Sequence, residues 1–247
     1  MKKIVTPLML ALSLAAAGNA FAQAAPAAPE STLSFNVGAV NEYRYRGISQ
    51  TRFDAALQGG ADYADKSGVY VGVWGSGIKW VKDAGGKSNA EVDYYGGYKF
   101  TVGEVAYDVG FLHYDYSGNA LAVSANTNEL YGAVTMGPTT LKYSQSTGNL
   151  FGFADSKGSS YVDLTANFDL GDGYTFTPHL GYQSVKGAGN SIYSYTDAAL
   201  TVGKDLGNGL SASAAVIGTN AKTGSYVSPV GKQLGKSGLV VGIKYAF

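Results

Sequence analysis

Apolar and polar side chains alternate along most of this chain. In the stretch that starts at Leu33, apolar residues recur at every second position, with Ser34 and Asn36 between them. A period of two places alternate side chains on opposite faces of a β-strand. Segments of about ten alternating residues, separated by turns, are typical of strands that cross a membrane as part of a closed barrel. The pattern therefore predicts β-strands with one apolar and one polar face.

Twelve segments of this kind follow one another. The first carries Tyr43 and Tyr45 on its apolar parity. The ninth carries Pro178 there, where a residue without an N–H predicts a local kink. The third is ambiguous, because apolar residues such as Val71 and Trp74 occupy both parities. The segments are residues 33–46, 55–63, 69–78, 91–100, 105–111, 129–136, 141–144, 161–170, 174–182, 195–202, 210–216 and 239–247.

The connections between these segments alternate in length. Short ones are residues 65–68, 101–104, 137–138, 171–173 and 205–209, and long ones are residues 80–89, 117–127, 146–158, 184–191 and 219–237. Short periplasmic turns and long outer loops are typical of bacterial outer-membrane barrels, which also have an even number of strands. No Asp, Glu, Lys or Arg occurs on the apolar parity, whereas a soluble barrel carries its charges outward. We expect an all-β fold, a transmembrane antiparallel up-and-down β-barrel of about 12 strands formed by residues 32–247.

Residues 1–22 have the features of a secretory signal peptide. Lys2 and Lys3 precede a mostly apolar stretch, and the sequence Ala-Phe-Ala supplies a cleavage site before Gln23. The apolar stretch is shorter than the roughly 20 residues of a membrane-spanning helix. An Ala/Pro-rich linker, residues 23–31, precedes the barrel.

Charge and cysteine content exclude several classes of function. Removing the signal peptide deletes two of the 18 basic residues and leaves 16 against 18 acidic ones, so no bulk charge favours nucleic acid. The chain has no cysteine, which excludes disulfides and thiolate metal sites. No cofactor or metal site is indicated, and the oligomeric state stays open.

Three motifs resemble those of a known family. Residues 41–50 (NEYRYRGISQ), 67–76 (SGVYVGVWGS) and 91–98 (EVDYYGGY) are similar to successive motifs of the TorF-type porins. The resemblance covers essentially the whole mature chain and is strongest before residue 131. It implies a β-barrel in the outer membrane whose solute is not settled.

An enzyme is the rival class, and the sequence offers little for it. Nucleophilic hydrolysis needs a Ser or Thr activated by a base, usually His. The two histidines, His113 and His179, lie in no nucleophile motif, and we expect them to pack at the lipid interface and in the lumen. Glu91 and Asp93 share a face and would suit acid-pair chemistry, but a polar lumen requires such groups anyway. We expect no enzymatic activity.

Basic residues concentrate near the expected outer ends of the strands, and acids in the short turns. Arg44, Arg46 and Arg52 share the lumenal parity near the outer mouth, where they would draw anionic solutes. Alternatively, they pair with Glu42, Asp54 or lipopolysaccharide. The mid-barrel polar face mixes acids and lysines, namely Glu91, Asp93, Asp108, Glu129, Asp163, Asp197, Lys99 and Lys142. Five tyrosines on the same face are expected to narrow the lumen: Tyr70, Tyr95, Tyr114, Tyr131 and Tyr161.

The expected function is passive diffusion of small hydrophilic solutes through the outer membrane. Twelve strands lie between barrels that side chains fill and barrels that hold an open channel, so a plugged structural or adhesin-type barrel is the alternative. The expected partners are outer-membrane lipid, lipopolysaccharide and the barrel-assembly machinery. The last would read the C-terminal strand, whose alternating apolar residues end at Tyr245 and Phe247.

The first prediction concerns export. The mature protein should begin near Gln23, fractionate with the outer membrane and migrate differently on gels before and after heating, because closed barrels resist detergent at low temperature. N-terminal sequencing and gel mobility check this. Recovery as a soluble periplasmic monomer without detergent contradicts it.

Overall fold

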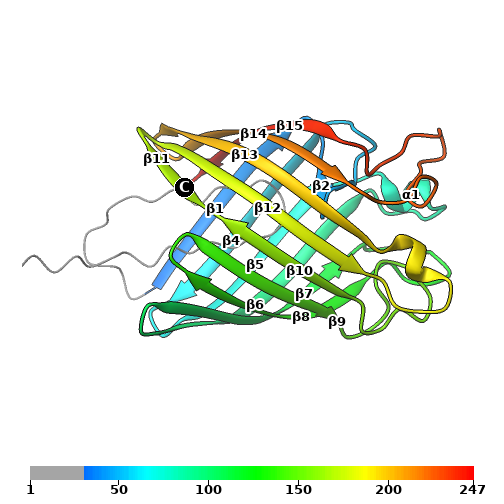
Figure 1. Cartoon of the computed structure of the whole chain (residues 1–247), viewed down its shortest axis with the longest axis horizontal. Coiled ribbons are helices and arrows are strands. Elements are labelled where there is room, and N and C mark those ends of the chain that lie inside the picture. The colour runs from blue at the N-terminus through cyan, green and yellow to red at the C-terminus, as the bar shows by residue number, and fades with distance from the viewer. Residues whose placement is uncertain (1–30) are drawn as a thin grey trace, which may run out of the picture.

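The computed structural model describes residues 31–247, so the expected signal peptide and nearly all of the linker lie outside the described residues. Twelve antiparallel strands form a closed barrel, in which each strand pairs with its neighbours along the chain and the last pairs with the first (Figure 1). The strands are β1 (Ser31–Val40), β4 (Ala56–Asp65), β5 (Val69–Gly77), β6 (Ala90–Val102), β7 (Val105–Asp115), β8 (Thr127–Met136), β9 (Thr139–Ser146), β10 (Ser160–Ala166) continued by β11 (Phe168–Gly171), β12 (Tyr174–Ser184), β13 (Tyr195–Gly207), β14 (Leu210–Thr219) and β15 (Gly238–Ala246). The expected fold class is confirmed.

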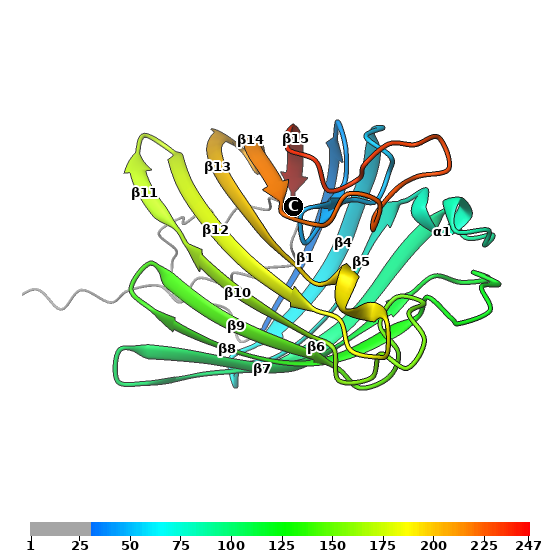
Figure 2. The same ribbon diagram turned by 45° about the vertical axis from the view of Figure 1, so that its right-hand side comes forward.

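Short turns and long loops lie at opposite ends of the barrel (Figure 2). The long loops contain the helix α1 (Trp80–Asp83), the 3-10 helix η1 (Asn190–Tyr193) and a small hairpin of β2 (Arg44–Tyr45) and β3 (Ile48–Ser49). Within residues 31–247, no helix has the length and apolar character needed to cross a membrane.

The barrel is apolar outside and polar inside. The outward side chains include Leu57 and Leu130, which are 75% and 55% exposed. The ambiguous third segment is resolved, because Val71 is exposed on β5 while Tyr70 is buried inside. An apolar exterior suits lipid, and a closed ladder satisfies every strand's backbone groups without water.

The expected kink at Pro178 does not interrupt β12. β12 runs unbroken through Pro178, whereas the neighbouring strand is interrupted at Asn167, between β10 and β11. Proline has no N–H to donate to the ladder, and the register of β12 is the same on both sides of Asn167. Asn167 instead donates its N–H to the Pro138 carbonyl at 2.8 Å, and its side chain accepts a bond from Thr177 at 3.3 Å.

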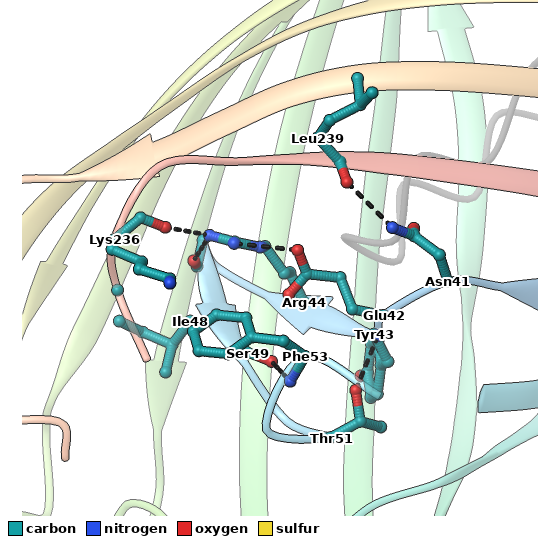
Figure 3. Close-up of polar contacts among 12 residues, drawn as sticks. Asn41, Glu42, Tyr43, Arg44, Ile48, Ser49, Thr51, Phe53, Lys236 and Leu239 are labelled. Carbon is teal, nitrogen blue, oxygen red and sulfur yellow. Dashed lines mark hydrogen bonds and ion pairs between the residues drawn. The ribbon is translucent and has the colours of Figure 1, made fainter. Parts of the chain in front are cut away.

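The first strand is shorter than expected. β1 ends at Val40, and the following residues turn into the barrel, so the expectation that Tyr43 and Tyr45 face lipid is wrong. The side-chain amide of Asn41 bonds the Leu239 carbonyl and the Val241 N–H, and this ends the pairing of β1 with β15 (Figure 3). The alternation continued past Asn41 because the inward segment is itself a strand, β2.

The second prediction concerns the C-terminal strand. Phe247 is 65% exposed, stacks on Phe35 with ring centroids 5.8 Å apart, and donates its N–H to the Phe35 carbonyl at 3.0 Å. Phe247→Ser should therefore impair assembly, measured as the heat-modifiable fraction in outer membranes. Lys244→Ser, on the lumenal face of β15, is the control and should assemble normally. Equal losses for the two variants contradict this assignment of faces.

Candidate functional site: the barrel lumen and its inward loop

The first long loop, residues 41–55, crosses the outer half of the lumen. Its side chains reach walls on different sides of the ring: Tyr43 bonds Glu91 on β6, and Arg46 bonds Glu129 on β8 and Gln183 on β12. The loop turns sharply at Arg46 and Gly47, whose φ values are 48° and 78°. Glycine adopts this left-handed conformation without a steric penalty. We call this segment the inward loop.

Arg46 is the strongest link between the inward loop and the wall. Its guanidinium donates two bonds to Glu129, at 2.7 and 3.0 Å, and one to Gln183 at 2.7 Å. It also lies over the Tyr161 ring, 4.3 Å from the centroid. Burial is the largest influence and disfavours the charged guanidinium, but Glu129, Tyr45 and Tyr114 together raise the pKa of Arg46 well above its usual value. The pair is therefore a buried, charge-assisted bidentate contact.

Arg44 bonds other residues of the inward loop and one residue of the last long loop. It donates to Glu42 at 3.0 Å, to the Gly47 carbonyl at 3.2 Å and to the Lys236 carbonyl at 2.7 Å (Figure 3). Arg44 is 4% exposed, so it does not stand free at the mouth.

Arg52 lies nearer the outer surface and pairs with Asp83 of α1. Beside it, the Lys79 ammonium bonds Asp54 and holds the pKa of that carboxyl below its usual value. Each of the three arginines thus has a carboxylate partner, and the structure does not gather them into one group. Strand parity missed this, because it placed Arg44 and Arg46 on a straight wall and Arg52 on the next strand.

The acids near the inward loop are enclosed. Glu91 accepts hydroxyl bonds from Tyr43 and Tyr116, each 2.6 Å long. Asp93 is fully buried, and neither of its carboxylate oxygens has a hydrogen-bond partner within residues 31–247. Glu129 is 1% exposed beneath Arg46. Glu91 and Glu129 therefore bind the inward loop, and none of the three carboxylates faces open solvent.

At mid-height, tyrosines lie flat across glycines of neighbouring strands. Tyr95 on β6 covers Gly72 on β5, the residue directly opposite, and its hydroxyl bonds Asp62 on β4 at 2.6 Å. A Cβ atom on Gly72 would collide with the Tyr95 ring. The ring therefore takes space that a side chain on β5 would otherwise fill, and it reaches an acid two strands away.

The same arrangement recurs around the ring. Tyr70 and Tyr131 cross Gly97 and Gly110 from opposite sides and meet at their hydroxyls, and Tyr70 also bonds Asp108 at 2.6 Å. Tyr161 crosses Gly181 and bonds Asp197 at 3.0 Å. Four of the five tyrosines therefore lie inside the barrel along its wall, over glycines of a neighbouring strand. Tyr114 instead meets Tyr45 of the inward loop and bonds Glu129 at 3.2 Å.

His179 is the centre of a second polar cluster. One ring nitrogen lies 3.3 Å from Asp163 and the other 2.9 Å from Asp197. The Thr165 hydroxyl is 3.2 Å from the ring, but it donates to Asp163 at 2.6 Å. Because both ring nitrogens face carboxylates, the ring is held as a donor and has no free lone pair with which to activate Thr165.

The other histidine lies apart from this cluster. His113 lies beside Tyr94, with ring centroids 6.3 Å apart, and contacts Asn128 at 2.7 Å. In the part of the chain that the structure describes, no group of His, Asp and Glu residues is arranged to hold a metal ion.

The third prediction concerns the Arg46–Glu129 pair. Removing one partner of a buried pair costs about 3–5 kcal/mol, because the other charge stays buried without compensation. Arg46→Gln should therefore lower the urea midpoint of unfolding strongly, and Arg46→Gln/Glu129→Gln should recover part of the loss. Arg52→Gln, at a more exposed pair, is the control and should have a smaller effect. Equal midpoints for Arg46→Gln and Arg52→Gln contradict a buried, stabilising pair.

Comparison with solved structures finds outer-membrane channels of the same fold. The KdgM porin in complex with disordered oligogalacturonate is 10% identical, with 88% of this chain and 99% of that chain covered and a TM-score of 0.55. The NanC porin is 9% identical, with coverage of 87% and 99% and a TM-score of 0.55. The COG4313 outer membrane channel from Pseudomonas putida F1 is 11% identical, with coverage of 91% and 99% and a TM-score of 0.54. At these identities, the likeness establishes the fold alone.

Comparison by sequence identifies one family. No curated protein matches the chain. One family model, described as a bacterial protein of unknown function (Gcw_chp), matches residues 23–247. The match spans the complete barrel, including the inward loop and the wall where tyrosines cover glycines. The chain therefore belongs to the Gcw_chp family.

Proposed function

We propose that this chain is a porin-like channel of the outer membrane, through which small hydrophilic solutes diffuse passively. The carrying observation is the closed barrel with an apolar exterior and a polar interior, in which tyrosine rings at mid-height lie over glycines of the wall. Twelve strands make a wider barrel than the eight whose interior side chains can fill. The apolar exterior supports the location, and the motifs that resemble the TorF-type porins agree with it.

The inward loop would form the constriction of this channel. Its residues bond β6, β8 and β12, so solutes must pass beside it. In this proposal Arg44 and Arg46 hold the constriction in shape. They do not act as free charges at the mouth, since both are buried and paired.

A plugged structural or adhesin-type barrel is the second candidate. Its supporting observation is the apolar cluster at the outer end, where Tyr43, Val81 and Tyr116 pack together from three different loops. Such packing would seal the barrel if it left no path beside the inward loop. Conductance separates the two candidates. Neither requires enzymatic chemistry, and we propose that the chain is not an enzyme.

Two partners follow from the surface. Exposed lysines on the outer loops, such as Lys82, Lys157 and Lys186, would meet lipopolysaccharide phosphates. The alternating C-terminal strand would be read by the barrel-assembly machinery, with Tyr245 and Phe247 facing lipid.

The fourth prediction tests the channel. Purified protein in planar bilayers should give discrete conductance steps. Gly72→Leu should reduce the step size, because the added side chain displaces the Tyr95 ring into the lumen. Gly132→Leu is the matched control, since a Cβ there meets nothing closer than 4.0 Å on the lipid-facing side of β8. It should leave conductance unchanged.

The possible results separate clearly. A wild-type protein that is folded, as judged by heat-modifiable mobility, but does not conduct supports the structural barrel and contradicts the channel. Equal conductance of wild type and Gly72→Leu contradicts the role given to the tyrosine-lined wall.

A further inference from the structure

Acidic and basic side chains of the lumen differ in how they are held. Nearly every lumenal carboxylate receives hydrogen bonds from the protein. Asp62 and Asp108 each accept a tyrosine hydroxyl at 2.6 Å, and Asp163 and Asp197 flank His179. Glu129 accepts Arg46. These bonds occupy acceptor oxygens of the carboxylates, and Glu129, Asp163 and Asp197 are buried as well.

Asp93 is the exception, and it lies away from the solute path. Its oxygens have no hydrogen-bond donor among the described residues, but the side chain is fully buried. A solute in the lumen therefore cannot contact it without displacing its surroundings.

Three lumenal lysines are held differently. Lys99, Lys142 and Lys244 are partly exposed on the lumenal faces of β6, β9 and β15. The ammonium of Lys142 lies over the Tyr131 ring, 4.0 Å from its centroid, and that of Lys99 lies over the Tyr70 ring at 4.8 Å. A ring face attracts the cation but leaves N–H groups available for an anion.

Ion pairs leave the N–H donors of these three lysines largely unused. Lys99 lies 4.0 Å from Asp108, and its ammonium nitrogen is buried without a hydrogen-bond partner in residues 31–247, so a bound anion would supply the acceptor that it lacks. Neither Lys142 nor Lys244 forms an ion pair within 4.0 Å in that range. Tyr70 thus acts twice, because its hydroxyl binds Asp108 and its ring face lies under the Lys99 ammonium.

The three lysines also surround the lumen. Around the closed ring, β9 lies three strands from β6, β15 lies five strands from β9, and β6 lies four strands from β15. Their charges therefore approach the lumen from three sides, as required to contact a solute that passes between them.

We propose that Lys99, Lys142 and Lys244 form a lumenal site for anionic oxygen groups, carboxylate or phosphate, which makes the channel prefer anions although acids outnumber bases in the mature chain. This inference rests on the proposed channel function and adds the solute class to it. Ammonium groups that keep donors free bind carboxylate and phosphate as point charges.

The test measures reversal potential in planar bilayers under a roughly threefold KCl gradient. At about 1 M salt the screening length is about 3 Å, so direct contacts between ions and side chains dominate. Wild type should show chloride preference. Lys99→Gln/Lys142→Gln/Lys244→Gln should lose that preference or reverse its sign. The triple Lys→Arg variant, which retains the charges, should keep it. Inorganic phosphate should reduce the KCl conductance of wild type in a saturable way, and that of the Gln variant much less.

A matched control removes the same number of charges elsewhere. Lys82→Gln/Lys157→Gln/Lys186→Gln alters exposed outer-loop lysines and should leave the reversal potential unchanged. Heat-modifiable mobility establishes that each variant is folded. Wild type that conducts with cation preference, or an unchanged reversal potential in the lumenal triple variant, overturns this inference while the channel function stands. A folded wild type without conductance contradicts the channel function itself, and the anion site with it.

Discussion

Backbone hydrogen bonding in lipid is the constraint on which the rest of this structure depends. A strand in the hydrocarbon region has no water to pair with, so the sheet must close, here through β1 and β15. Closure fixes which side of each strand faces lipid. Contact with the hydrocarbon then requires that side to be apolar. All polar groups then face one small interior, where they must find partners in each other. The inward loop and the tyrosine–carboxylate bonds are two ways in which the chain provides those partners.

The fold was predictable because a barrel strand has a strict period of two. A residue's parity gave its face wherever one parity was apolar, and the alternation of short and long connections gave the two ends. Parity failed in residues 41–46, because the inward hairpin has the same period as the wall. The side chain of Asn41, which bonds the Val241 N–H and the Leu239 carbonyl of β15 beside the last backbone bond, marks the point where the wall ends.

The site was less predictable, because it depends on pairs across strands. Sequence identified Tyr70, Tyr95, Tyr131 and Tyr161 as lumenal, but their direction depends on glycines that are distant in sequence and adjacent in the sheet. Asp62 and Gln183 were overlooked for the same reason, since each gains its role from a residue on another element. A search for tyrosine and glycine at the same parity on consecutive segments is the sequence signal that would have found the covered wall.

Net charge describes such a lumen poorly. Two carboxylates of equal formal charge act differently when one is enclosed beneath Arg46 and the other accepts only a tyrosine hydroxyl at the edge of the lumen. The Lys142 ammonium over the Tyr131 ring keeps its N–H donors free. The Arg46 guanidinium, in contrast, uses N–H donors to bond both oxygens of Glu129. In a narrow lumen, what a solute meets is therefore set by which charges still have unused donors or acceptors. In the proposed anion site those groups are lysines, although residues 31–247 carry 16 basic and 17 acidic side chains.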